Sequence, residues 1–531
     1  MKRTFQLSAI FAVVASLAAC GGNDDAPNNG TAAPTGTWLA GDLHSHTVQS
    51  ADAGATQTLS LLLDKAIGVY GLDYLALTNH LRLSNRDDKG TAVSPTIPFA
   101  LGMARYEVPA VQSAQSAGSY AKATIVSGFE WDMPTHDHLG IAIFDNGSTL
   151  TASTKMAKEF EYVFTTESAA SFDSQDVAAW NTKYAGKRYN ATADDALQAI
   201  AWLKTNFPET SWMVVNHPSR NKRYTIADFR SFHDIAPGIF VAIEGMVGNQ
   251  MEPDRGGYTS AYTADFAVNR VYGGVDAVVA KLGGAWDALL GEGRRIWNVA
   301  DSDSHFKVIG TNSSGYYPGE YAKTYLFAKS NDPAAILAAL KSGKSFGVFG
   351  DLINALDFSV AGAAGAKGMG EELSAAAGET VTITIAFKSP ATNHYKVPYD
   401  NDAYVAPAPV VDHVDLIVGE VTAKAAAGTA AYDAATNPST RVLKRFTKAD
   451  WKVDANGYAR MSFVTTATKG QYFRLRGTNL DVEASGLMSG GEPLADQKVT
   501  TADATQRFND INDRNYKSLW FYSNPVFVSV K

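Results

Sequence analysis

The sequence predicts an α/β protein over its first two thirds, followed by a part built mainly from β-strands. Seven short apolar runs before residue 306 each lead into a polar or ionisable residue and then a loop, and helical patterns separate several of them. Short apolar runs bounded by turn residues are typical of strands buried on both faces. After about residue 355 the runs alternate or are rich in β-branched and aromatic residues. Strands that alternate with helices indicate parallel β/α units, and about seven of them indicate a barrel.

The seven N-terminal runs are the expected strands of that barrel. They cover residues 37–46, 73–80, 123–130, 138–144, 211–218, 238–245 and 294–305. Apolar residues at helical spacing predict helices over 57–67 and 193–203, and a third helix over 333–341 ends before Gly343. In such barrels the active site lies at the carboxyl ends of the strands, where this chain places its His, Asp and Glu residues.

The C-terminal part is expected to form an antiparallel, sandwich-like all-β domain over residues 356–531. Its candidate strands cover residues 379–387, 411–419, 459–467, 471–477 and 519–530. Gly-, Ala- and Asn-rich segments separate them, as in a sandwich. Polymer binding is one possible role for this domain, and we favour structural support of the barrel.

The composition excludes several classes of protein. The 531 residues are 45% hydrophobic, which allows a large core and excludes wholesale disorder. The net charge of −8 argues against non-specific binding of nucleic acid, which needs a basic surface. A single cysteine excludes an intramolecular disulfide and a cysteine metal cluster. Eight of the 10 histidines lie before residue 310, which is the feature that a function must explain.

The first residues predict export and lipid attachment. Two basic residues precede an apolar run over 7–19 that is too short to span a membrane as a stable helix. The run ends in Leu-Ala-Ala-Cys-Gly, which resembles the bacterial lipobox and implies that cleavage leaves Cys20 as the lipidated terminus. Residues 1–19 are therefore the expected signal peptide, and 20–37 a flexible tether. An ordinary signal peptide with an incidental cysteine is the alternative.

The expected location is the periplasmic side of the cell envelope, with the outer membrane favoured over the inner. The protein would be soluble but attached to the membrane through its lipid.

Candidate metal ligands lie at the ends of successive predicted strands. His44 and His46 point to the same side of an extended strand end, where two imidazoles can share one cation. The other candidates are Asp52, His80, Glu130, His138, His217, Asp303 and His305. Each alone has an ordinary explanation, such as a capping histidine, a salt bridge or a helix N-cap. Together they predict two or three divalent ions, because the number of ligands exceeds the four that one tetrahedral ion needs. The absence of sulfur among these ligands favours Zn, Mn or Fe.

These motifs resemble the polymerase and histidinol phosphatase (PHP) superfamily of metal-dependent hydrolases. The matching pieces are DLHSHT, LTNH, GFE, HDHLG, NHP and DSDSH, in the family's order. The resemblance implies a distorted (β/α)7, TIM-like barrel over residues 38–355 that holds up to three metals. It assigns the first metal to His44, His46, Glu130 and Asp303. It assigns the second to Glu130, His138 and His217, and the third to His80, His305 and Asp52.

One position departs from the family pattern. Asn79 stands where the family usually has an aspartate before the histidine of the second motif. An amide accepts a hydrogen bond from an imidazole more weakly than a carboxylate does, so the departure affects the expected tuning of the third site.

We expect Glu130, Asp303 and Arg220 to take part in catalysis, as a hypothesis about the mechanism. Metal coordination lowers the pKa of water from about 15.7 to about 7. A hydroxide bridging metals held by Glu130 would attack phosphorus in line. Arginines beyond the ligand-bearing strand ends could bind a phosphate bidentately. They are Arg82, Arg86, Arg220 and Arg255, of which Arg220 directly after His217-Pro218 is preferred.

The leading function is therefore a metal-dependent phosphoesterase acting on small phosphodiesters or phosphomonoesters. A carbamate or carboxylic ester hydrolase is the first alternative, because lipoprotein-like branches of the superfamily with a β-rich tail resemble carbamate hydrolases. A non-catalytic metal- or ligand-binding surface lipoprotein is the second. The expected partners are a small-molecule ester and, through Cys20, the membrane.

Overall fold

The structure is a computed structural model that describes residues 36–144, 149–221, 223–258, 270–306, 314–391 and 408–531. Residues Gly36–Lys531 form one compact unit. The predicted signal peptide, Cys20 and most of the predicted tether lie outside the described residues. Among the helices that the structure describes, none combines the length and the apolar character that crossing a membrane requires.

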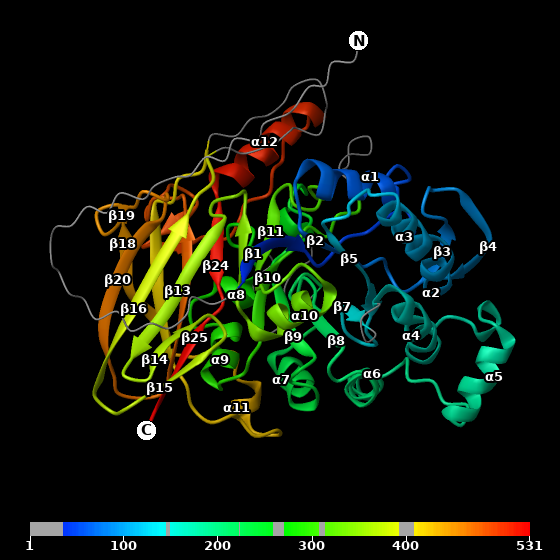
Figure 1. Ribbon diagram of the computed structural model, residues 1–531, viewed down its shortest axis with the longest axis horizontal. Helices are drawn as coiled ribbons and strands as arrows, with labels where there is room; N and C mark the ends of the chain where they lie inside the picture. Colours follow the sequence, from blue (N-terminus) through cyan, green and yellow to red (C-terminus); the bar gives the residue numbers. More distant parts are fainter. Residues whose placement is uncertain (1–35, 145–148, 222, 259–269, 307–313, 392–407) are drawn as a thin grey trace, which may run out of the picture. The chain divides into compact units, whose positions relative to one another are not determined.

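All seven predicted N-terminal strands are present (Figure 1). They are β1 (Thr37–Asp42), β2 (Tyr74–Leu77), β5 (Thr124–Ser127) with β6 (Phe129–Asp132), β7 (His138–Ile143), β8 (Ser211–Val215), β9 (Phe240–Met246) and β10 (Trp297–Ala300). The single run predicted over 123–130 is two strands, separated by Gly128. Further strands of this part are β3 (Leu83–Arg86), β4 (Ala92–Pro98), β11 (Ala322–Ala328) and β12 (Ser345–Phe349).

These strands belong mainly to two sheets. One contains the parallel series β1-β2-β5, and the other has the order β10-β9-β8-β7-β6. The sheets are continuous in sequence at Gly128, and a parallel bridge between Ser45 and Ser304 links the ends of β1 and β10. The mixed α/β class is confirmed, while a closed TIM-like barrel remains a prediction.

The expectation that all units are parallel is wrong for β7. This strand pairs antiparallel with both β6 and β8. Only residues 133–137 connect β6 to β7, and a parallel connection needs a crossover of about a dozen residues or more. Strand β11 likewise runs antiparallel to β1.

The three predicted helices are present with small shifts at their ends. They are α1 (Leu59–Leu63) continued by the π-helical η1 (Asp64–Val69), α6 (Ala193–Asn206) and α10 (Pro333–Ser342). Helix α10 ends before Gly343 in a left-handed conformation, as predicted. The sequence analysis did not predict α2 (Phe99–Gly102), η2 (Met103–Glu107), α3 (Val108–Ser116), α4 (Thr149–Phe164), η3 (Ala169–Ser171), α5 (Ser174–Lys183), α7 (Ile226–Ile235), η4 (Arg255–Gly257), α8 (Ala277–Ala280) and α9 (Ala285–Gly291).

The C-terminal part is rich in antiparallel strands, as predicted. Its strands are β13 (Ala355–Gly362), β14 (Gly365–Gly368), β15 (Glu372–Ala375), β16 (Glu379–Lys388), β17 (His413–Glu420), β18 (Arg441–Thr447), β19 (Lys452–Val453), β20 (Ala459–Ala467), β21 (Gln471–Thr478), β22 (Met488–Ser489), β23 (Glu492–Pro493), β24 (Trp520–Ser523) and β25 (Val526–Val530). Strand β15 is the exception to the antiparallel pairing, because it runs parallel to β25. Strands β13, β16 and β20 lie side by side in one five-stranded sheet, at the left of Figure 1. Two helices, α11 (Ala430–Asp433) and α12 (Ala504–Lys517), accompany the strands.

The second C-terminal sheet is an extension of the first N-terminal sheet. Strand β24 pairs with β12 on one side and with β21 on the other, so an 11-stranded sheet crosses the predicted boundary at residue 355. Buried residues from both parts belong to one hydrophobic cluster, including Val214, Ile243, Leu475 and Phe521. The division into two domains remains a prediction.

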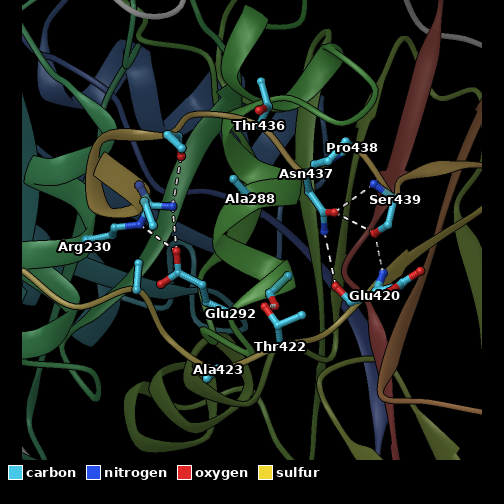
Figure 2. Close-up of a pocket in the computed structure, with 14 residues that line it drawn as sticks. Arg230, Ala288, Glu292, Glu420, Thr422, Ala423, Thr436, Asn437, Pro438 and Ser439 are labelled. Atoms are coloured by element: carbon cyan, nitrogen blue, oxygen red, sulfur yellow. Dashed lines mark hydrogen bonds and ion pairs between the residues drawn. The ribbon is translucent and has the colours of Figure 1, made fainter. Parts of the chain in front are cut away.

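Charged side chains also cross this boundary. The buried carboxylate of Asp287 on α9 accepts two hydrogen bonds from Arg474 on β21, at 2.8 and 2.7 Å, and a third from Tyr472. Both partners of the ion pair have side chains only 1% exposed. Beside this junction lies a pocket of about 370 Å³ (Figure 2). Its polar groups bond to one another, as Arg230 does to Glu292 and Asn437 to Ser439.

We predict that Arg474→Met lowers the free energy of unfolding by about 3–5 kcal/mol, because it leaves the Asp287 carboxylate buried without its counter-ion. Urea denaturation of the purified chain measures the loss. Arg460→Met is the matched control, because Arg460 pairs with Asp454 at the surface, where an ion pair contributes little. Equal effects of the two substitutions would contradict the prediction.

Candidate metal centre

The Glu130 carboxylate lies at the centre of the predicted ligands. Strand β6 places Glu130 beside the end of β2 through a parallel bridge to His80. Its oxygens approach His44 Nε2 and His80 Nδ1 at 3.1 Å and His46 Nε2 at 3.3 Å. His138 Nδ1 lies 3.1 Å away, and His217 Nε2 lies 3.4 Å away. Five imidazoles from four strand ends therefore surround a carboxylate that is 1% exposed.

Asp303 is the second carboxylate of the cluster. Its Oδ1 lies 3.2 Å from His44 Nε2, 3.4 Å from His46 Nε2 and 3.3 Å from His305 Nδ1. Asp52 lies at the edge of the cluster, 3.0 Å from His80 and 3.6 Å from His305, with its side chain 47% exposed. The structure thus brings all nine predicted ligands together.

Four sets of these side chains are close enough to hold an ion. The sets are His44, His46, Glu130 and Asp303; His46, His80 and His305; His80, Glu130 and His138; and Asp137, His138 and His217. The first set is the ligand set that the family resemblance implies for the first metal. The other sets differ from those that the resemblance implies. His46, in place of Asp52, lies with His80 and His305, and Asp137, in place of Glu130, lies with His138 and His217. The assignment of ligands to individual ions stays a prediction.

Two of the ligands have backbone conformations that side chains rarely adopt. His217 has φ = 28° and Asp303 has φ = 48°. Such conformations persist where the surrounding structure enforces them, commonly at functional sites. Gly248 packs directly beneath Asp303, and a Cβ there would lie 2.2 Å from the Asp303 Cβ. A glycine is therefore required at this close approach.

A buried carboxylate that the sequence analysis missed orients the first histidine. Glu244 on β9 lies 3.1 Å from His44 Nδ1 and also accepts a hydrogen bond from the backbone N–H of His217 at 3.0 Å. A carboxylate partner on the second ring nitrogen orients a ligand histidine and raises its basicity. Glu244 stands in a predicted strand, so the signal was an ionisable residue in an otherwise apolar run.

Asn79 has a different role from the one expected. Its side-chain oxygen accepts hydrogen bonds from the Thr47 backbone N–H at 2.7 Å and from the Ser50 hydroxyl, and its amide donates to Glu107. It fixes the loop after β1 instead of bonding an imidazole. Ser50 in turn contacts His46 Nδ1 at 2.9 Å, so Asn79 acts on the ligands through this hydroxyl.

The electrostatics of the cluster favour a bound cation. Burial would raise the pKa of Glu130, but His138, His44 and His80 hold that pKa well below its ordinary value. Burial would likewise lower the pKa of His44, which Asp303, Glu130 and Glu244 raise well above its ordinary value. Positive charge is therefore needed to stabilise the buried carboxylates, and either protons on the histidines or a metal ion can supply it.

Within the described residues, several ligand atoms are buried without a hydrogen-bond partner. They are Glu130 Oε2, Asp303 Oδ1, His80 Nδ1, His138 Nδ1 and His217 Nδ1, with Asp137 Oδ2 beside them. Buried polar atoms normally have hydrogen-bond partners. A metal ion between these nitrogen and oxygen atoms would explain why they lie close together without such partners. The donors are nitrogen and oxygen, which suit Zn²⁺, Mn²⁺ or Fe. The residues present therefore fit a divalent metal centre.

The cluster of candidate ligands opens into a cavity of about 230 Å³. Besides cluster residues, its lining includes Arg220, Asn249, Glu252, Phe306 and Ser314. Arg220 donates to Asp303 Oδ2 at 2.9 Å and to the Gly256 carbonyl, which fixes its guanidinium at the cavity wall. The sequence analysis missed Asn249 and Glu252, because only the fold brings their loop to the cluster.

The other three candidate arginines have different positions. Arg255 is buried and bonds to Gln250, Tyr321 and Asp496, so its proposed role in binding phosphate is wrong. Arg82 pairs with Asp132, which also contacts His138 at 3.0 Å. Arg86 donates to the Ala53 carbonyl. Arg220 is thus the one of the four that lines the cavity.

Comparison with known proteins adds one similarity. No family model matches the chain, and no curated protein matches it. Among solved structures, the chain is similar to a two-domain protein from Bacteroides vulgatus that contains a predicted PHP-like metal-dependent phosphoesterase. The two share 14% sequence identity with a TM-score of 0.35, over 87% of this chain and 94% of that chain.

We predict that Glu244→Gln weakens metal binding about 10- to 100-fold, because the His44 imidazole loses its charged partner. Competition with a chromophoric chelator measures the affinity. Glu161→Gln is the matched control, since Glu161 is equally buried but bonds to the backbone of Phe99 and Ala100. A metal affinity that falls equally in both variants would refute the orienting role of Glu244.

Removal of metal is expected to lower the melting temperature. A ligand that binds only the folded state at about 100 times its Kd stabilises that state by about 2.7 kcal/mol. Differential scanning calorimetry with and without a chelator, followed by addition of Mn²⁺ or Zn²⁺, tests this expectation. The Glu130→Gln variant should show a smaller shift. Identical melting of the chelated and the metal-loaded protein would argue against the centre.

Proposed function

We propose that this protein is a metal-dependent hydrolase of small phosphoric esters. The observation that supports the proposal is the group of buried nitrogen and oxygen atoms around Glu130 and Asp303 that have no hydrogen-bond partner among the described residues, next to a cavity with a fixed arginine. Bound divalent ions supply an activated water at neutral pH and stabilise the charge that develops on phosphoryl oxygens. Their ligands would be the nine His, Asp and Glu residues described above.

Arg220 supports a phosphate ester as the substrate. Its hydrogen bonds to Asp303 and Gly256 use Nη2 and Nε, and both contacts hold the planar guanidinium against the cavity. Burial would lower its pKa, but Asp303 and the other anionic groups nearby raise it, so the guanidinium stays charged. A fixed guanidinium binds phosphate oxygens with directional, charge-assisted hydrogen bonds. In this proposal Arg220 orients the phosphoryl group and Asp303 positions Arg220.

The cavity supports a small substrate. About 230 Å³ is below the usual range of about 300–1,000 Å³ for pockets that enclose drug-sized ligands. Polar and ionisable residues form its lining apart from Phe306. We therefore propose a compact, polar ester, which fits a phosphomonoester or a short phosphodiester better than a polymer.

We further propose that the protein acts outside the cytoplasm while attached to a membrane. The support is the sequence Leu-Ala-Ala-Cys at residues 17–20 after a basic and then an apolar segment. Incorporation of labelled palmitate into the full-length protein, and its loss in Cys20→Ser, would test the attachment.

The function is tested with p-nitrophenyl phosphate, bis-p-nitrophenyl phosphate and 1-naphthyl carbamate, each with added Mn²⁺ or Zn²⁺. We expect hydrolysis of a phosphate ester, and a loss of at least about 100-fold in Glu130→Gln and His217→Ala because each removes a ligand. Glu161→Gln is the control for loss of a buried glutamate elsewhere. Hydrolysis of the carbamate alone would replace the proposed substrate class. A metal-loaded protein without turnover on any of the three would favour a binding protein.

A further inference from the structure

One ionisable carboxyl group in the cavity is not part of the metal cluster. The described lining contains four carboxylates, of which Asp52, Glu130 and Asp303 contact the clustered histidines. The fourth is Glu252, which lies in the loop after β9 and faces the same cavity as His217, Arg220 and Asp303. No hydrogen bond or ion pair to its carboxylate occurs among the residues that the structure describes. The metal centre leaves this group without a role.

The loop that carries Glu252 is held from two sides. On the cluster side, Asn249 donates to Asp303 Oδ2 at 2.7 Å, and its backbone N–H donates to the Ser302 carbonyl. Asn249 has φ = 54°, a left-handed conformation that asparagine tolerates better than most residues. On the other side, the Arg514 guanidinium of α12 donates to the carbonyls of residues 250, 252 and 253. The backbone of Glu252 is therefore fixed at the wall of the cavity that this residue lines.

The surroundings of Glu252 keep a proton on its carboxyl group near neutral pH. Burial, with smaller contributions from Asp254 and Asp303, raises the pKa of Glu252 to about 7 against the lowering effect of Arg220 and Arg514. These groups face it from its own loop, from the loops after β8 and β10, and from α12. General acids act best when their pKa lies near the working pH.

We propose that Glu252 is the general acid that protonates the leaving alcohol of the ester, an inference that rests on the proposed function. In this step the bond between phosphorus and the alcohol oxygen breaks, and its electron pair stays on that oxygen. The Glu252 carboxyl group gives its proton to the same oxygen. The attacking water contributes its oxygen to phosphorus and releases one proton to solvent, and the Glu252 carboxylate regains a proton from solvent. The ester and one water thus become an alcohol and a phosphate.

A general acid at Glu252 matters only for esters whose leaving alcohol must be protonated. An acidic phenol leaves without protonation, whereas an alkyl alcohol leaves poorly as an alkoxide. A positioned acid accelerates such steps by about 10²- to 10⁴-fold. The natural substrate inferred from the site is therefore an alkyl phosphate ester, such as a phosphorylated polyol, and not an aryl phosphate.

The experiment compares the full chain and its Glu252→Gln variant, both loaded with Mn²⁺ or Zn²⁺, on glycerol 2-phosphate and p-nitrophenyl phosphate. We expect kcat for glycerol 2-phosphate to fall about 10²- to 10⁴-fold, and kcat for p-nitrophenyl phosphate to fall less than about 10-fold. The wild-type rate on glycerol 2-phosphate should decrease as the pH rises above about 7, and the variant should lack this decrease. Glu252→Asp, which keeps a carboxyl group, should recover part of the lost rate.

The matched control is Glu167→Gln, because Glu167 is also half-buried but bonds to the Leu83 backbone N–H outside the cavity. Metal content and melting temperature, measured for every variant, separate loss of an acid from loss of the fold. Equal losses on both substrates, or no loss on either, would overturn the role of Glu252. If the wild-type protein hydrolyses neither phosphate, the proposed function fails and this inference fails with it.

Discussion

The burial of the Glu130 carboxylate among five imidazoles is the constraint on which the rest of the structure depends. Charge taken out of water is costly unless it is neutralised, and here neutralisation comes from ligands on successive strand ends. Each ligand must place a ring nitrogen or a carboxylate oxygen toward the centre, and His217 and Asp303 do so from a left-handed backbone. It also explains the outer carboxylate of Glu244, since rotation of the His44 ring would remove one of the five imidazoles from Glu130.

The parts of the site that could be predicted are those encoded by neighbouring residues. His44 and His46 stand two apart on an extended segment, so their common direction follows from strand geometry alone. Glu244 on β9 and Glu252 in the loop after it could not be identified in this way, because each is a single carboxylate whose role depends on segments distant in the sequence. Asn79 shows the same limit, since its contact with Thr47 spans 32 residues of sequence.

The fold shows a similar division. Apolar runs identified the N-terminal strands, because a strand buried on both faces consists of a nearly continuous run of hydrophobic residues. The direction of β7 depended on the length of its connection to β6, which is readable in principle from residues 133–137. Helix α12 escaped prediction because its buried face includes polar side chains, among them Asn512 and Asn515. Those amides bond to Tyr316 and to the loop at Gln250, which apolar periodicity does not reveal.

The position of β24 has a consequence for the order in which the molecule is assembled. This strand lies between β12 and β21, although residues 350–519 separate it from β12 in the sequence. The edge of β12 therefore has no partner until residues 520–523 arrive, and Arg514 reaches the loop of Glu252 only shortly before. Pairing over such long sequence separations forms late in folding. A nascent chain would thus acquire its cluster of histidines well before it acquired a finished site.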